Sequence, residues 1–264
     1  MNVLLHFAFL SMLVVGIAGE ARTADPAQSD GRLTAGVSFD IPGMGYKNPK
    51  TDAIEGFEPD VARAIAEKLL GAPDRVDFVQ VLDKDRIKAL QDDTVDMVVS
   101  QLTITPDRAA QVDFSIPYYI TGEGLLVPKD SGIKGFEDLA GKRIAATAGS
   151  LSLRRMQASL PSLPGATLVI TPTSSDTLVA VANGKADAAS NDLIDLSFLQ
   201  SASDNPDQYE LIDIGPHFPP KPFGVAVKQG NSELVERLNE AIAVLKSNGD
   251  IDRLLNKAID EVKH

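Results

Sequence analysis

Two series of alternating strand and helix patterns constrain the fold of this chain more than any other feature. Apolar runs that are typical of strands recur at 33–37, 76–81, 96–99, 143–146, 168–171 and 186–190. Helix patterns lie between them, and one of these begins near Pro59 and ends at Gly71. This alternation favours an α/β protein in which parallel strands carry helices on both faces.

Two extended stretches, 119–128 and 218–228, bracket the second series, and both contain Gly or Pro within a strand-like run. The simplest topology inserts a second lobe into the first through two hinge strands. We expect lobe 1 to comprise residues 30–121 and 223–264, and lobe 2 to comprise residues 122–222. One continuous sheet is the alternative, but two series on either side of a long crossover fit two cores better.

Within lobe 2, Ser174 or Ser175 is expected to cap a helix that ends at Gly184. After the second hinge strand the chain finishes in two helices that Gly249 separates.

The N-terminal segment reads as a signal peptide over residues 1–24. An almost wholly apolar run, Val3 to Ala18, precedes small residues that suit a signal peptidase, with cleavage expected after Ala18, Ala21 or Ala24. The run is shorter than the roughly 20 apolar residues of a membrane span. No Lys or Arg precedes it, which departs from the signal pattern, and a retained anchor is the alternative.

Composition excludes several classes of function. The formal net charge of −12 argues against nucleic-acid binding, because no basic stripe exists to neutralise phosphates. The chain has no cysteine, which excludes disulfides, thiolate chemistry and lipid attachment to cysteine, and points to free diffusion in a periplasm. Metalloprotease, P-loop and nucleophile-elbow motifs are missing from the sequence, so we expect no metal, cofactor or covalent chemistry.

The first candidate site follows the strand 96–99. A polar corner, 100–103, leads to Thr105 as helix cap, with Pro106 and Arg108 in the first turn. Strand ends of this kind bind small ligands in α/β folds, and a guanidinium offers a carboxylate two parallel hydrogen bonds. Taken alone, Arg108 reads as the partner of Asp107 or Asp113 in a salt bridge.

Other candidates are weaker when they are taken one at a time. Asp192 follows a strand of small residues and would ordinarily be the N-cap of the apolar helix 193–199. The turn at Gly149 presents the Ser150 hydroxyl and backbone N–H groups at a helix start, an arrangement that binds anions. By composition alone Arg86 is a solvated helix residue.

The run VDMVVSQLTITPDRAAQVDFSIPYY, residues 95–119, closely resembles the ligand loop of bacterial amino-acid-binding proteins, the solute receptors of ABC importers. KADAASND, residues 185–192, is similar to the pattern that ends in the family's ammonium-binding aspartate. The resemblance covers about Leu33 to Ile259. It implies a two-lobed, type II periplasmic-binding-protein-like fold.

The resemblance also implies a role for each candidate residue. Arg108 would bind the ligand's α-carboxylate, with N–H groups near Thr103, Ser150 and Leu151. The α-ammonium group would be bound by Asp192, the Thr103 hydroxyl and the Gln101 carbonyl. Arg86 and Ser38 would meet the ligand side chain. Arg86 favours glutamate or aspartate, while Ser38, where a cation is frequent in acidic-ligand members, favours glutamine or asparagine.

The expected partners are a polar L-amino acid and the membrane permease subunits of an ABC transporter, with the receptor acting as a periplasmic monomer. Two alternatives stay open. One is a periplasmic enzyme on the same scaffold, resembling cyclohexadienyl dehydratase, for which Glu58 or Glu123 would be the acid–base candidate. The other is a receptor that captures its ligand for a signalling partner.

Overall fold

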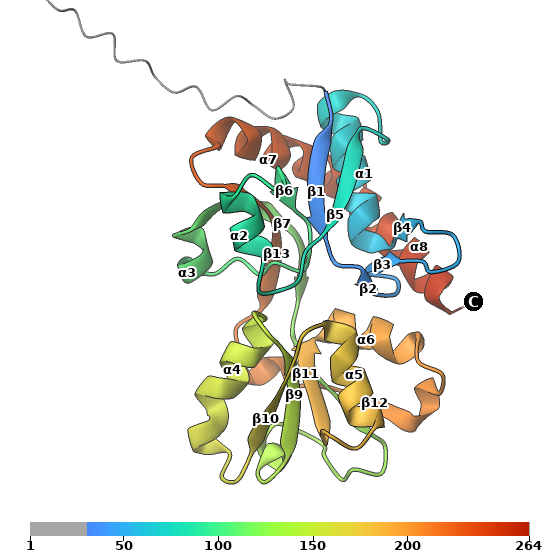
Figure 1. Ribbon diagram of the computed structural model, residues 1–264, viewed down its shortest axis with the longest axis vertical. Helices are drawn as coiled ribbons and strands as arrows, with labels where there is room; N and C mark the ends of the chain where they lie inside the picture. Colours follow the sequence, from blue (N-terminus) through green and yellow to red (C-terminus); the bar gives the residue numbers. More distant parts are fainter. Residues whose placement is uncertain (1–30, 264) are drawn as a thin grey trace, which may run out of the picture.

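Residues 31–263, which the computed structural model describes, form two five-stranded sheets and one three-stranded sheet. The two larger sheets lie one above the other (Figure 1). The first has the order β5 (Val76–Gln80), β1 (Leu33–Val37), β6 (Met97–Val98), β13 (Lys221–Lys228), β7 (Val112–Thr121). The second has the order β10 (Thr167–Thr171), β9 (Arg143–Thr147), β11 (Ala188–Asp192), β8 (Glu123–Pro128), β12 (Tyr209–Asp213).

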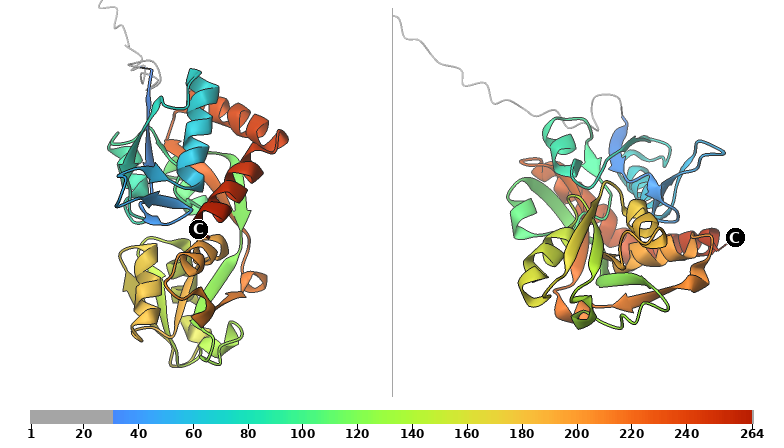
Figure 2. Two further views of the ribbon diagram at one scale, coloured as in Figure 1. Left: turned by 90° about the vertical axis from the view of Figure 1, so that its right-hand side faces the viewer. Right: turned by 60° about the horizontal axis from the view of Figure 1, so that its bottom comes forward.

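We call the half built on the first sheet lobe 1 and the half built on the second lobe 2. The chain passes between them twice, from β7 to β8 and from β12 to β13 (Figure 2). The fold is therefore the expected two-lobed one, with the second lobe inserted in the first, while the exact lobe boundaries stay a prediction. The predicted signal peptide lies outside the described residues. Within 31–263 no helix is long and apolar enough to cross a bilayer.

The sheets are mixed: the strands of the two alternating series pair in parallel as expected, and antiparallel strands are added to each sheet. β1 pairs in parallel with β5 and β6, and β9 pairs in parallel with β10 and β11. The strands that carry the chain between lobes, β7, β8 and β13, and also β12, pair antiparallel with their neighbours. The antiparallel partners are distant in sequence, since β7 pairs with β13 and β8 pairs with β12.

The helices of lobe 1 follow the sequence patterns closely. They are α1 (Phe57–Leu70), α2 (Arg86–Gln91), α3 (Pro106–Ala109), α7 (Ser232–Ser247) and α8 (Asp250–Val262). Gly71 ends α1 in the left-handed region, φ 82°, as expected of a C-terminal glycine. The apolar face of α7 is buried through Leu234, Leu238, Ile242 and Leu245. A three-stranded sheet of β2 (Asp40–Ile41), β3 (Gly45–Lys47) and β4 (Ile54–Glu55) was not predicted, because such short strands carry no periodicity.

Lobe 2 contains α4 (Leu151–Ser159), α5 (Ser174–Ala182), α6 (Leu193–Ser201) and the 3-10 turns η2 (Glu137–Leu139), η3 (Leu160–Ser162), η4 (Pro206–Gln208) and η5 (Gly215–His217). Ser150 caps α4 by accepting a hydrogen bond from the Leu153 N–H at 3.0 Å. The predicted cap of α5 was wrong. Thr173, which is still extended, accepts from the Asp176 N–H, and Ser174 is already helical.

The two lobes are packed against each other. Gly43, at φ +83°, lies so close to α6 and α8 that an added Cβ would stand 2.4 Å from the Phe198 ring. Across the same interface, Asp40 of β2 accepts a hydrogen bond from the Ser175 N–H of α5 at 3.0 Å. These contacts join opposite lobes, so the structure is that of a closed form.

Candidate functional site

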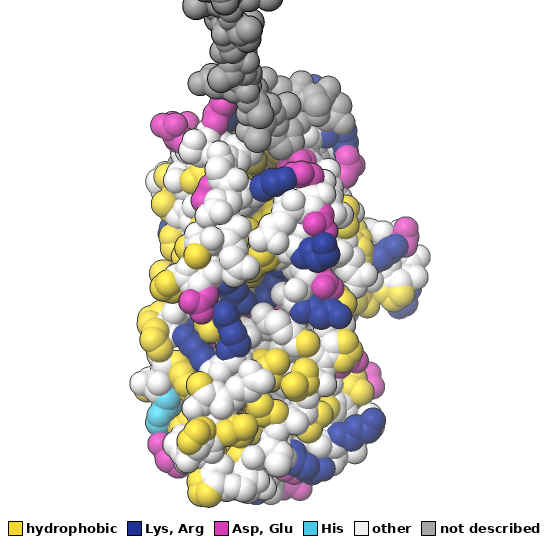
Figure 3. Space-filling view, turned by 60° about the vertical axis from the view of Figure 1, so that its left-hand side comes forward, with side chains coloured by type: hydrophobic (Ala, Val, Ile, Leu, Met, Phe, Trp, Pro, Cys, Tyr) yellow, Lys and Arg dark blue, Asp and Glu magenta, His cyan; other side chains and the backbone are white. Residues whose placement is uncertain are grey.

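Arg108 bridges the two lobes. Its Nη1 donates to the Thr103 carbonyl at 3.0 Å and its Nη2 donates across the interface to the Gly149 carbonyl at 3.1 Å. The side chain starts from α3, which begins as expected with Thr105 as cap, and the residue is only 4% exposed. The strand end, the proline and the cap thus hold a guanidinium between the lobes. Figure 3 shows Lys and Arg side chains gathered at this waist of the molecule.

No carboxylate of the described residues forms an ion pair with Arg108, so the salt-bridge alternative was wrong. Asp107 instead approaches Arg154 at 3.8 Å, and Asp113 accepts from the Gly230 N–H at 2.7 Å. Burial, reinforced by the nearby cations Arg86 and Arg154, lowers the pKa of Arg108 to about 9. Because burial and the neighbouring cations disfavour the charged form of Arg108, binding of an anion to this guanidinium is strongly favourable.

The polar corner before α3 is held by a buried carboxylate. Gln101 adopts φ 42°, a left-handed conformation that is costly for a non-glycine residue. Glu58 of α1 accepts hydrogen bonds from the Gln101 N–H at 2.7 Å, from the Gln101 amide and from the Tyr118 hydroxyl at 2.5 Å. Burial raises the pKa of Glu58 to about 7, against the lowering effect of these donors. Gln101 also donates to the Ser38 hydroxyl at 3.2 Å, which brings two predicted site residues together.

Arg86 lies beneath this corner and is not the solvated helix residue that composition suggested, since it is 1% exposed. Its Nε donates to the Asp83 carbonyl at 3.1 Å and its Nη1 donates to the Ser100 carbonyl. Its Nη2 lies 3.2 Å from the Asp83 carboxylate. Every nitrogen of the guanidinium therefore has a partner within lobe 1.

Asp192 lies at the start of α6, at the end of β11, and is 6% exposed. Its side chain makes no capping hydrogen bond, so the predicted capping role was wrong. The carboxylate instead forms an ion pair with Lys221 of β13, Nζ to Oδ1 2.9 Å. Lys221 was missed because a lysine in an extended stretch carries no sequence signal of burial.

A cluster of neutral polar groups, also missed, lies at the strand ends of lobe 2. Ser174 accepts a hydrogen bond from the Asn191 amide at 3.0 Å and lies 3.3 Å from the Thr147 hydroxyl. All three are buried. Ser150 and Leu151 lie close by along the chain, at the start of α4. Lobe 2 thus presents hydroxyl and amide groups beside Asp192.

Asp195, one turn into α6, is buried at 1% exposure and its Oδ1 has no hydrogen-bond partner. Burial raises the pKa of this carboxyl well above its usual value, and the nearby Asp192 and Glu58 raise it further. The group is therefore an unpaired carboxyl inside a region already rich in carboxylates.

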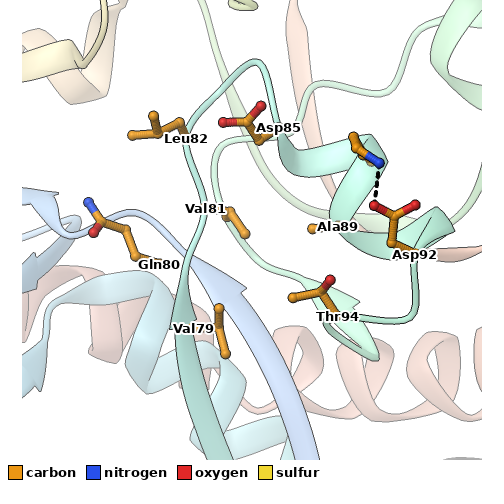
Figure 4. A pocket seen from close by; sticks show the side chains of 9 residues that line it. Val79, Gln80, Val81, Leu82, Asp85, Ala89, Asp92 and Thr94 are labelled. Carbon is orange, nitrogen blue, oxygen red and sulfur yellow. Dashed lines mark hydrogen bonds and ion pairs between the residues drawn. The ribbon is translucent and has the colours of Figure 1, made fainter.

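A separate surface pocket of about 520 Å³ lies between β5 and α2 (Figure 4). Val79 from the strand and Val81 just after it face Ala89 from the helix, while Asp85 and Asp92 lie on the helical side of the pocket. None of the predicted site residues lines this pocket. Within residues 31–263, no group of three or more His, Asp or Glu side chains is placed to hold a metal ion.

The chain is similar in sequence to a family of known proteins. The sequence model of the bacterial extracellular solute-binding proteins, family 3, matches residues 33–261. The chain is 34% identical over 231 residues to the ABC transporter glutamine-binding protein GlnH of Bacillus subtilis, covering 87% of this chain and 82% of the relative.

Solved structures are similar as well. A solute receptor for L-cysteine from Neisseria gonorrhoeae superimposes with a TM-score of 0.79 at 27% identity, over 89% of this chain and 93% of that one. An ancestral amino-acid-binding protein, described as a precursor of cyclohexadienyl dehydratase, superimposes with a TM-score of 0.76 at 32% identity, over 88% and 97%.

The unpaired Asp195 generates a stability prediction. Its pKa is raised in the folded state, so ionisation of this carboxyl destabilises the fold. This destabilisation is absent below the unfolded pKa of about 3.9 and grows as the pH rises. Asp195→Asn should therefore stabilise the protein by about 1–3 kcal/mol at pH 8 and much less at pH 4.5, measured by denaturant unfolding. The exposed Asp204→Asn is the control and should show no such difference. An Asp195→Asn gain that is equal at both pH values would contradict this account.

Proposed function

The chain belongs to family 3 of the bacterial extracellular solute-binding proteins, and we propose that it captures a free polar amino acid between its lobes for an ABC importer. The observation that carries this proposal is Arg108, a buried guanidinium that joins the lobes and contacts carbonyls but no carboxylate. Asp192 on the other lobe supplies the opposite charge. A zwitterionic α-amino acid carries an α-carboxylate that can pair with Arg108 and an α-ammonium that can pair with Asp192.

The α-carboxylate binds Arg108 in this proposal, assisted by backbone N–H groups near Thr103 and at the start of α4. The α-ammonium binds Asp192, with the Thr103 hydroxyl and the Gln101 carbonyl completing its acceptors. Burying a zwitterion is costly unless each charge is paired, so the ligand stabilises only the form in which both lobes reach it. A micromolar dissociation constant, equivalent to about −8 kcal/mol, is sufficient for capture.

For the ligand side chain we propose a neutral polar group. Arg86 is buried, and its nitrogens are engaged by Asp83 and Ser100, which leaves it poorly placed to meet a second carboxylate. The remaining groups near the site, Ser38 on lobe 1 and the Thr147–Ser174–Asn191 cluster on lobe 2, are hydroxyls and amides. Glutamine fits these donors and acceptors, and the similarity to a glutamine-binding protein supports the same choice.

We place the protein in the periplasm as a monomer that docks on membrane permease subunits when closed. Binding without turnover is supported by the two glutamates considered as acid–base groups. Glu58 is held by Gln101 and Tyr118, and Glu123 is held by Lys221 and Arg155. Neither is a free carboxylate facing a bound ligand.

A ligand screen tests this function. Among the twenty amino acids, L-glutamine should raise the melting temperature most, and calorimetry should show one site per chain with no product formed. L-glutamate should bind more weakly, because the Arg86 guanidinium is already engaged by Asp83 and Ser100. Binding of no amino acid would contradict the proposal, and so would turnover of prephenate or arogenate. A preference for L-glutamate would contradict only the proposal of a neutral ligand side chain and would leave the proposal of amino-acid binding intact.

Replacing the bridging arginine tests the carboxylate contact. Arg108→Gln should weaken amino-acid binding at least 100-fold, because a charge-assisted bidentate pair is lost in a buried place. Arg143→Gln is the matched control, since Arg143 pairs with Asp187 on the surface of lobe 2 and should leave affinity unchanged. Equal effects of the two substitutions, measured by calorimetry, would remove Arg108 from the binding site.

The backbone approach at Gly149 tests closure. Gly149 has φ +85°, and an added Cβ would lie 2.4 Å from the Lys84 Cα of the opposite lobe. Gly149→Ala should therefore hold the lobes apart and weaken binding at least tenfold. Gly141→Ala is the control, because Gly141 has φ +73° with nothing within 4 Å of an added Cβ. Both variants should lose stability from backbone strain, but loss of affinity in the control as well would contradict the closure argument.

A further inference from the structure

Lys221 is a fully buried cation, 0% exposed, at the first residue of β13. Its ammonium lies 2.9 Å from Asp192 Oδ1 and 3.0 Å from Glu123 Oε2, and it donates to the Ser152 hydroxyl at 2.7 Å. Two carboxylates and a hydroxyl thus surround the ammonium.

The contacts of Lys221 join the crossing strands to the proposed ligand site. Lys221 pairs with Thr121 at the end of β7, where the chain first leaves lobe 1. Glu123 begins β8 and is the register partner of Asp192 in the antiparallel pairing of β8 with β11. One ammonium thus links both connections between the lobes to the carboxylate at the start of α6.

The register places two buried carboxylates side by side. Glu123 is also bound by Arg155 at 3.1 Å and by the Ser190 hydroxyl at 3.0 Å, so it has other partners besides Lys221. For Asp192, Lys221 is the one basic partner within 4 Å among the described residues. Removal of Lys221 would therefore leave Asp192, rather than Glu123, as an uncompensated buried charge.

We propose that Lys221 is a positioning residue that keeps Asp192 ionised and oriented to receive the α-ammonium group of the ligand. This inference rests on the proposed function of Asp192 and adds the group that prepares it. The ligand then supplies a second cation to a carboxylate that is already charged, and capture requires no proton to be released from Asp192.

Several charged groups set the protonation of Asp192. Burial raises its pKa, Lys221 lowers it, and Glu123 and Asp83 raise it. Asp195 on the same helix and Arg108 on the opposite lobe also interact with it. Loss of Lys221 should therefore raise the pKa of Asp192, while loss of the Glu123 charge should lower it. These opposite shifts test whether both groups act on the charge of Asp192.

Two substitutions separate the alternatives. Lys221→Met removes the cation and keeps the chain length, and Glu123→Gln removes the neighbouring carboxylate charge and keeps the shape. The first readout needs no ligand: the carboxyl ¹³C resonance of Asp192 is followed from pH 3 to 9 in each ligand-free protein. We expect the midpoint to lie higher than in the wild type for Lys221→Met and lower for Glu123→Gln.

The second readout is the affinity for L-glutamine, or for the best ligand of the screen, between pH 5 and 9. Affinity of Lys221→Met should fall about tenfold per pH unit below its raised midpoint, whereas that of the wild type should begin to fall only at lower pH. Affinity reduced by the same factor at every pH would assign Lys221 a structural role and overturn the inference.

The two readouts distinguish this inference from the proposed function. A wild type that binds no amino acid would contradict the function, while the Asp192 titrations would still test the role of Lys221. If Lys221→Met does not fold, Lys221→Gln, which removes the charge and keeps a hydrogen-bond donor, replaces it in both readouts, and an Asp192 midpoint equal to or below that of the wild type would overturn the inference.

Discussion

A buried guanidinium on one lobe and a buried carboxylate on the other are the pair of charges on which this structure depends. Arg108 reaches across the interface to the Gly149 carbonyl, and Asp192 lies at the start of α6 in lobe 2. The two residues do not form an ion pair with each other, so a ligand that carries both a positive and a negative charge can pair with each of them. The fold supplies the geometry, because Arg108 follows β6 and Asp192 ends β11, and these are the central strands of their sheets.

Both charges are held by a second set of buried polar groups. On lobe 1, Glu58 fixes the backbone and side chain of Gln101, and Arg86 binds the Ser100 carbonyl of the same corner. On lobe 2, Lys221 binds Asp192 and Glu123 at the point where the chain crosses between lobes. Such networks stabilise a corner to the extent that their members are satisfied. Among the described residues, the buried oxygens Ser100 Oγ, Asp192 Oδ1 and Asp195 Oδ1 have no hydrogen-bond partner, although Asp192 Oδ1 forms the ion pair with Lys221.

Local patterns allowed much of the fold and part of the candidate site to be predicted. The helix cap at Thr105 and the helix stop at Gly71 lie where propensity places them, because those interactions span only a few residues. The mixed sheets, the ion pair of Lys221 and the burial of Arg86 depend on residues far apart in the sequence. A lysine in an extended run and an arginine at a helix start look solvent-exposed until the tertiary fold surrounds them.

A crystal structure of the protein with its bound amino acid tests the central claim most directly. The account predicts the α-carboxylate in hydrogen-bond contact with the Arg108 guanidinium and the α-ammonium in contact with Asp192, with the two lobes closed around the ligand. A ligand seated elsewhere, or bound between the lobes with either of these side chains turned away from it, would contradict the account.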